Sequence, residues 1–453
     1  MSVNKLLDPI LQQGIRHTNF FEGRLLTGED LRNQQQANRE HDRLLGRSIG
    51  SGIVEGLELE LLQDGLDGSV PTVRIKKGLA INRTGEIIGL PENDITLALA
   101  EPEKPFQWQE AEFYTCAGAP GVQHLPENAG VYILVMSPTA GYKERAPKSG
   151  LGDNGIAKGC GSKFIQEGIS FRLVSLSLPK PQEESDAEIT PAVFISQALE
   201  DFNFPTKTDV KKLSLFRNAI AHYTFSTTEL FNSYQDPAAE YYSSNEEDLV
   251  SRLYGKSVAN VLDDCDIPLG LIYWTINGIE FMDQWATRRM LVDSVRISNP
   301  GNSSVLDVIS EARWRQFQQQ INELVLMTEK PEEMELKDLF RWLPPVGILP
   351  LYGSGFSSGF DMERAFSDVT VLRPIFVEGG EVQKIMRDSV YASPIDLNSK
   401  EFIWRYVVRE NIQASYSMES TRPKPKMIFA SPTMSAYGEA RYDAKYWSFG
   451  NYR

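Results

Sequence analysis

The chain has 453 residues, of which 41% are apolar and 24% are charged, so its composition is that of a globular protein and excludes wholesale disorder. Its strongest apolar run, residues 267–274, is far shorter than the roughly 20 residues that a membrane-spanning helix needs. The 46 basic and 61 acidic residues give a net charge of −15, which argues against nucleic-acid binding because an acidic chain repels phosphates.

A polar helix is predicted near the N-terminus. Thr27 and Asp30 have the spacing of a capping box, so we expect a helix from about Gly28 to Gly46. Its few apolar residues form only a thin stripe: Leu31, Ala37, Leu44 and Leu45. The helix is therefore expected either to lie on the surface or to pack against a partner through polar contacts.

Short antiparallel strands are predicted between residues 57 and 99. Apolar residues alternate with charged ones at 57–61 and again at 73–76, and Asn82 to Gly85 form a turn signal between further apolar pairs. This pattern predicts an antiparallel sheet or a small barrel.

The rest of the chain predicts a mixed organisation. Two strands are expected at 131–135 and 169–174, with a Gly/Lys-rich loop over about 138–163 and a charged linker at 179–186. A mainly helical region follows over about 190–345. It contains a helix at roughly 303–327, near-helical spacing of Phe281, Trp285, Arg288 and Val292, and one strand at 269–276. A proline-rich connector at 342–350 then leads into strands and a short helix near 380–388.

These elements predict a multidomain α+β protein. Its expected parts are an N-terminal helix with an antiparallel β domain, an irregular β-containing region, a mainly helical region and a β-rich C-terminal region. The corresponding ranges are 1–104, 105–185, 186–345 and 346–453.

The cysteine pattern bears on the compartment. Cys116, Cys160 and Cys265 are odd in number and far apart in sequence, which argues against a disulfide framework. The first residues lack the basic and apolar regions of a secretory signal. We therefore expect a cytoplasmic protein.

No motif for catalysis, cofactor binding or metal binding emerges. The loop 152–163 lacks the spacing of a phosphate-binding loop, and the glycines of 353–359 do not form a dinucleotide-binding motif. Cys116, His124 and Cys160 match no zinc pattern, and Asp263, Asp264 and Asp266 lack the spacing of a calcium loop. A pair of glycosidase carboxylates stays open, because such residues need not be close in sequence.

The C-terminal residues suggest an interface. Aromatic and arginine side chains are common anchors of protein–protein contacts. The interface candidates are Tyr437, Tyr442, Tyr446, Trp447, Phe449 and Tyr452, together with Arg288 and Arg289. The tail either docks on a neighbouring subunit or folds back on its own domain. Its basic residues also suit single-stranded nucleic acid, which the acidic remainder disfavours.

A family resemblance spans much of the chain. The segments that carry it are residues 20–31, 52–59, 77–88, 267–271, 281–289 and 343–347. In this order they resemble uncharacterised proteins found with phage-tail-like contractile injection systems. The resemblance implies an accessory or baseplate-associated structural part, with no catalytic residue to carry over.

Three hypotheses follow. The first is a non-enzymatic structural subunit of a large assembly, in contact with other subunits of a contractile tail-like particle. Self-association and peripheral membrane contact through the assembly are compatible with it. The second is an adaptor that binds a glycan or membrane head-group surface through exposed aromatics. The third is a hydrolase of cell-wall or polysaccharide material.

Overall fold

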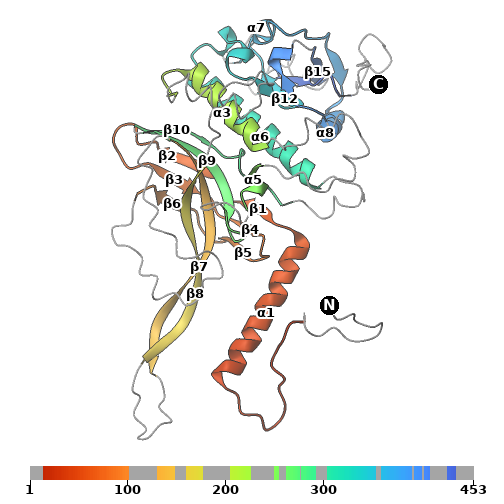
Figure 1. The fold of residues 1–453 in the computed structure, drawn as a ribbon. Coiled ribbons are helices and arrows are strands. Elements are labelled where there is room, and N and C mark those ends of the chain that lie inside the picture. Colours follow the sequence, from red (N-terminus) through yellow and green to blue (C-terminus); the bar gives the residue numbers. More distant parts are fainter. Residues whose placement is uncertain are drawn as a thin grey trace, which may run out of the picture.

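A computed structural model describes most of the chain (Figure 1). The described residues are 14–100, 130–147, 160–176, 205–225, 249–254, 262–275, 277–291, 304–352, 359–389, 392–399, 402–408 and 426–434. Helices and antiparallel strands build several packed layers, so the α+β class expected from the sequence is confirmed.

The N-terminal half begins with a long helix and two small sheets. Helix α1 (Gly28–Ile49) leads into β1 (Gly52–Gly56), which pairs with β4 (Gly78–Ile81) and β5 (Ile87–Leu90). A second sheet joins three further antiparallel strands: β2 (Leu59–Gln63), β3 (Thr72–Ile75) and β6 (Ile95–Ala98). The strand pattern is confirmed, and among the described strands the arrangement is two separate sheets and not a closed barrel.

The central sheet has the order β10-β9-β7-β8 and joins distant parts of the chain. Its four strands are β7 (Gly130–Pro147), β8 (Cys160–Ser175), β9 (Ile267–Thr275) and β10 (Gly278–Asp283). Since β7 pairs with β9, this one sheet crosses the domain boundary expected at residue 185. The two regions on either side of that boundary therefore share one structural unit.

Both faces of the central sheet are covered. Leu134 and Met136 of β7 pack against the two N-terminal sheets, whereas Ile133 and Val135 face the helices, as a side-chain period of two requires. The covering helices are α3 (Val210–Phe225), α5 (Leu249–Arg252) and α6 (Ser304–Met327). Burial on both faces explains why β9 is a nearly continuous apolar run.

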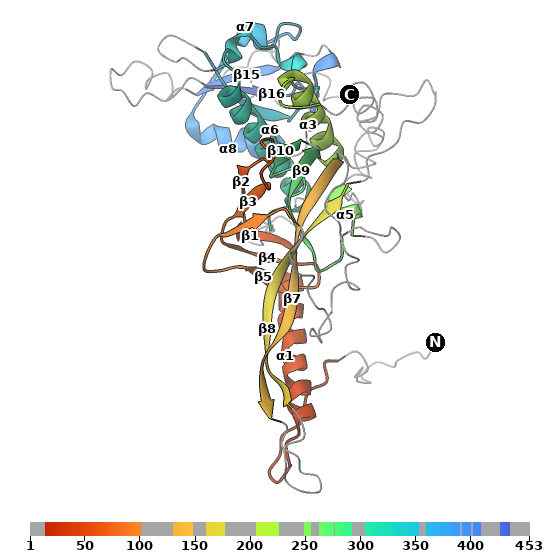
Figure 2. The same cartoon turned by 90° about the vertical axis from the view of Figure 1, so that its left-hand side faces the viewer.

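The outer part of β7 and β8 forms a ribbon. The two strands stay paired from Tyr132–Ser175 to Pro147–Cys160, whereas β9 pairs with β7 only as far as Met136. The prediction of a loop over 138–163 is therefore wrong for residues 138–147 and 160–163, which belong to the paired strands. Figures 1 and 2 show this ribbon and α1 projecting from the same side of the body.

The C-terminal half packs on the other end of α6. A four-stranded sheet has the order β12-β16-β15-β13, and β11 pairs with β14 in a two-stranded sheet. The strands are β11 (Trp342–Leu343), β12 (Val346–Pro350), β13 (Ile375–Val377), β14 (Ile395–Asp396), β15 (Trp404–Val408) and β16 (Lys426–Ala430). Helices α7 (Met362–Ala365) and α8 (Gly379–Asp388) flank them, and single 3-10 turns lie at Pro331–Glu333, Leu336–Asp338 and Leu397–Ser399.

Two local predictions differ from the structure. The stretch from Phe281 to Arg288 is not helical, because Phe281 lies in β10 and the next residues turn beneath α6. The proline-rich connector at 342–350 is built into two sheets, because its prolines leave the flanking backbone groups free to pair. The helices expected at 303–327 and near 380–388 are confirmed as α6 and α8.

Candidate interaction site

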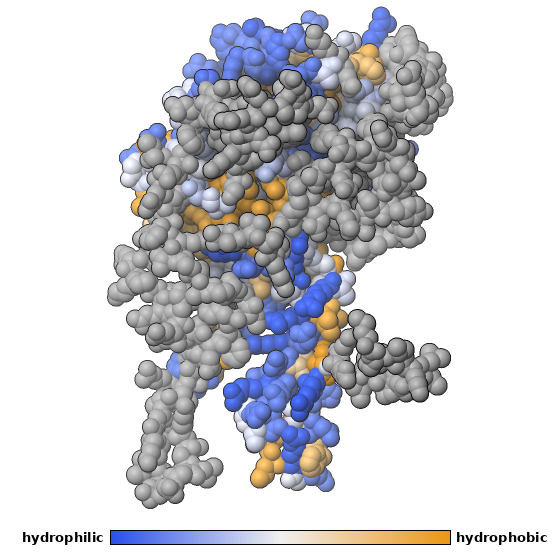
Figure 3. Space-filling model, viewed as in Figure 1, coloured by the Kyte–Doolittle hydropathy of each residue, from blue (hydrophilic) through white to orange (hydrophobic). Residues whose placement is uncertain are grey.

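Most residues of the N-terminal projection, which we define as residues 14–49, are exposed. Of the 22 residues of α1, only Ala37 and Gly46 are buried. Large apolar side chains lie in the open here, and Leu25 is 89% exposed. The full set is Phe20, Phe21, Leu25, Leu26, Leu31, Leu44, Leu45 and Ile49. Figure 3 shows apolar side chains at the free end of the projection and along one side of it.

Local interactions start α1 where the sequence predicts. The side chain of Thr27 accepts a hydrogen bond from the Asp30 amide, and the Asp30 carboxylate accepts one from the Thr27 amide, which completes the predicted capping box. These bonds to Thr27 lower the pKa of Asp30. The Arg24 guanidinium also pairs with Asp30, so the preceding loop is bound to the first turn.

The end of α1 next to the body is held tightly. Gly46 lies so close to the Gly85 backbone that a Cβ would sit 2.0 Å from its carbonyl oxygen. Arg43 donates to the Glu86 carboxylate over 3.0 Å through Nε. Farther out, Arg39 pairs with Glu167 of β8 over 2.6 Å, so α1 and the ribbon lie side by side, as Figure 2 shows. The projection is thus anchored at one end and exposed at the other.

Three of the exposed apolar residues of α1 share a face. At about 100° per residue, Leu31, Leu45 and Ile49 fall within roughly 40° of one another around the helix. Their exposed fractions lie between 48% and 63%. Asn38 and Asp42 fall on the same face between them, so the exposed apolar side chains of this face lie near the two ends of α1.

The interface candidates predicted from the sequence divide into two groups. The aromatic tail, Tyr437 to Tyr452, lies outside the described residues. Arg289 is half-buried and donates to the backbone carbonyls of Ala286 and Arg288. Arg288 is only 1% exposed, so the predicted interface role does not fit it. Its guanidinium donates to the carbonyls of Gly56 and Leu57 and thus joins the turn after β10 to the N-terminal sheets.

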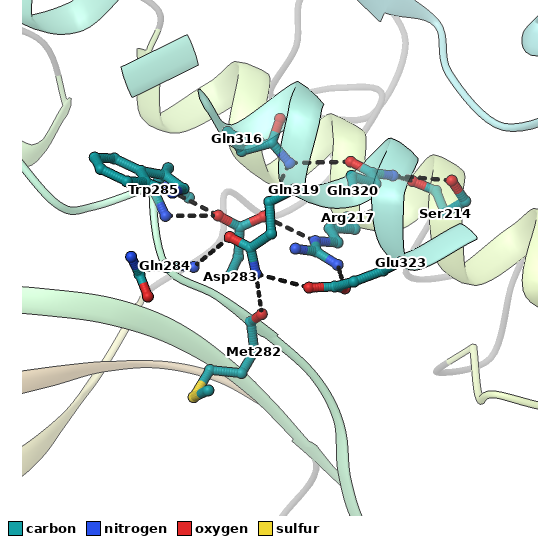
Figure 4. Close-up of polar contacts among 12 residues, drawn as sticks. Ser214, Arg217, Met282, Asp283, Gln284, Trp285, Gln316, Gln319, Gln320 and Glu323 are labelled. Carbon is teal, nitrogen blue, oxygen red and sulfur yellow. Dashed lines mark hydrogen bonds and ion pairs between the residues drawn. The ribbon is translucent and has the colours of Figure 1, made fainter. Parts of the chain in front are cut away.

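A buried polar network lies between the central sheet and helices α3 and α6 (Figure 4). Both Asp283 carboxylate oxygens are saturated. One accepts from the amides of Trp285 and Ala286, and the other accepts from Arg217 Nε at 2.8 Å and Gln316 at 2.9 Å. The network joins α3, β10 and α6, and its one signal in the sequence is a run of glutamines in α6.

The charged groups of this network are paired with one another, as expected for a structural role. Burial acts to lower the pKa of Arg217, but Asp283 and Glu323 outweigh it and raise that pKa above its ordinary value. Gln319 donates to Glu323 over 2.8 Å and to the carbonyl of Met282. Every carboxylate here already binds a cation or an amide, so the network holds its helices in place.

A pocket of about 360 Å³ opens beside the network, between β2, β10, α3 and α6. Glu280 and Glu323 both contribute to its lining, which bears on the hydrolase hypothesis. Glu280 accepts from the Lys207 amide and from the Thr275 hydroxyl, and Glu323 accepts from Arg217 and Gln319. Both carboxylates are thus engaged as acceptors, which disfavours either one as a general acid.

The predicted metal candidates give no metal centre in the described part. Asp266 is bound by Arg172, by the Ser137 hydroxyl at 2.5 Å and by the Asp263 amide at 2.7 Å, so the acidic turn at 263–266 is an ion-paired turn. Burial raises the pKa of Asp266, although Arg172 opposes it. No group of three metal-ligating side chains gathers among the described residues. Cys116 and His124 lie outside them, as does the side chain of Cys160.

The cysteine prediction needs a correction, because Cys265 is disulfide-bonded. Distance in sequence does not measure distance in space, and Cys265 lies in the core beside β4. The two glycine-rich loops considered for phosphate or dinucleotide binding lie largely outside the described residues. Residues 152–159 and 353–358 lie outside the described chain, and residues 160–163 belong to β8.

In the described ranges, no helix combines the length and the apolar character needed to cross a bilayer. No protein-family model matches the chain, and no curated protein matches it.

Proposed function

We propose that this chain is a non-enzymatic structural subunit of a large assembly, and that it docks there through the N-terminal projection. The observation that carries the proposal is the exposure of eight large apolar side chains on residues 14–49. Burying one such side chain is worth about 1.5–3 kcal/mol, so leaving several in water on a protruding element favours a partner that covers them.

The assembly we propose is a phage-tail-like contractile injection system, with this chain in the baseplate or an associated part. Its support is the sequence resemblance together with the position of the first segment that carries it. Residues 20–31 form the exposed end of the projection, where their own fold buries almost none of their apolar surface. A segment placed in this way suits assembly better than folding.

The test begins with the native host. Cells are lysed gently, large particles are sedimented, and the pellet is examined by mass spectrometry and electron microscopy. The proposal expects this chain at a fixed ratio to sheath and tube proteins. Its presence only among free proteins would refute the contractile particle as its assembly.

A variant pair tests the docking surface. Replacing Leu25 and Leu26 by aspartate is expected to release the chain from its particle while its own melting temperature stays unchanged, because both side chains are exposed. Ile87→Asp is the matched control, since Ile87 is 68% exposed on β5, outside the projection. Equal retention of both variants in the particle would exclude the projection as the docking element.

A further inference from the structure

The pocket between α3, α6, β2 and β10 has an apolar lining. Leu59, Leu213, Phe281 and Leu324 are buried residues that line it. Its volume of about 360 Å³ lies at the small end of the range for ligand-binding pockets, about 300–1,000 Å³. It therefore has room for one or two large apolar groups.

The lining continues onto the surface at the end of α6. Leu326 is 85% exposed and Met327 is 54% exposed, and both contribute to the pocket. A small molecule enclosed by the pocket would leave these two side chains in water. An occupant that extends beyond the pocket would cover them, as an amphipathic segment does in a groove.

The charged side chains around the pocket indicate which charge its occupant carries. Two cationic side chains border it, and each is already paired: Lys207 with Asp64 over 2.7 Å, and Arg217 with Asp283 and Glu323. Four carboxylates lie in or beside the lining: Asp64, Asp283 and Glu323 pair with these two cations, and Glu280 accepts from the backbone amide of Lys207. An anionic head group would meet excess negative charge here, whereas a cationic group would be attracted.

Glu323 is where such a cation would bind. Its side chain is 39% exposed, while that of its partner Arg217 is only 6% exposed. One side of the ion pair thus faces the surface as a carboxylate, on the same helix as the exposed Leu326 and one turn before it. A basic residue next to an apolar anchor would meet both features together.

From these features we propose that the pocket receives an apolar side chain from a basic amphipathic segment of a partner protein. The segment's positive charge pairs with Glu323, and its apolar face covers Leu326 and Met327. This site lies on the body of the molecule, apart from the N-terminal projection, and the inference does not depend on the proposed function.

The probe is a fluorescently labelled 14-residue helix of leucine and lysine, titrated with the full chain at physiological ionic strength. We expect saturable binding, with slower hydrogen exchange in α6 and β10 on binding. Leu326→Glu and Met327→Glu are each expected to weaken binding about tenfold or more, the factor for losing one buried apolar side chain. Circular dichroism checks that both variants are folded.

The control is Ile87→Glu, which makes the same change of charge at an exposed apolar position on β5. It should bind at least as tightly as the unchanged chain does. The pair separates pocket binding from general attraction to an acidic protein, because an added carboxylate strengthens attraction to a basic peptide. Tighter binding by the Leu326 and Met327 variants would therefore overturn the proposal.

Two other outcomes would also overturn it. One is equal affinity for a peptide with glutamate in place of lysine, which would remove the role of charge. The other is binding of dodecyltrimethylammonium below its micelle concentration without binding of the basic peptide. That result would assign the pocket to a small cationic amphiphile and not to a protein segment.

Discussion

Arg288 donates a hydrogen bond to the carbonyl oxygen of Leu57 over 2.7 Å, across 231 positions of the chain. Leu57 has a φ of +58°, in the left-handed region that leucine rarely adopts, and the preceding Gly56 has a φ of +62°. Arg288 donates to the carbonyls of both residues. A buried arginine therefore holds a strained corner of the N-terminal sheets against the turn that follows β10.

Arg288→Met should destabilise the chain by about 2–4 kcal/mol, because two buried carbonyls lose their donor. The measurement is the free energy of unfolding in urea. Arg74→Met is the control, since Arg74 pairs with Glu60 on the surface, where a pair is worth about 0–1 kcal/mol. Similar losses in the two variants would show that Arg288 does not clamp this corner.

Gly46→Ala should detach α1 from the body, because its Cβ would lie 2.0 Å from the Gly85 carbonyl oxygen in a backbone contact that cannot yield easily. We expect faster hydrogen exchange in α1 and β5 and faster proteolysis near residue 50. Gly28→Ala changes the same helix at a position where the Cβ meets nothing within 4 Å. If both variants exchange alike, the Gly46 contact does not anchor the helix.

Stability should fall as the pH drops below about 6.5, because His222 is buried and neutral. Burial, with Arg313 and Arg341 nearby, holds the pKa of His222 well below 6.5. The unfolded chain takes up a proton below pH 6.5 while the folded chain does not. The loss approaches about 1.4 kcal/mol per pH unit until the folded state is protonated too.

His222→Phe tests this pH dependence, since phenylalanine can keep the stacking on Trp342, where the ring centroids are 4.3 Å apart. The slope of unfolding free energy between pH 6.5 and 5 should become shallower. His41→Gln, at an exposed position of α1, should leave the slope unchanged. An unaltered slope in His222→Phe would assign the pH dependence to other groups.

Digestion of the unreduced protein, followed by mass spectrometry, should find the Cys265 peptide in a disulfide link, and not in one with the Cys160 peptide. Cys160 is an unsuitable partner, because it pairs with Pro147 at the far end of the ribbon. Cys265 adjoins Asp266, which binds Ser137 ten positions nearer the body. Ten strand residues span about 33 Å, whereas disulfide-linked Cα atoms lie within about 7 Å. A link to Cys160, or three alkylated thiols, would contradict this assignment.

The local elements were predictable because their signals lie within a few residues. The capping box of Thr27 and Asp30 fixes where α1 starts, and alternation sets the strands of the N-terminal sheets. The helix predicted over residues 281–288 was wrong for a related reason. Its apolar spacing resembles a helix, but Phe281 reaches the core from a strand and Arg288 reaches it from a turn.

The α+β class, the polar helix at the N-terminus and the acidic net charge can be read from the residues alone, because each follows from composition or short-range periodicity. Only the tertiary structure placed Asp283 between Arg217 and Gln316, Arg288 on Leu57, and Glu323 beside an apolar pocket. Each of these relationships joins residues from 30 to more than 200 positions apart or depends on which helix face is covered. Long-range packing decides such contacts, and local sequence patterns do not encode it.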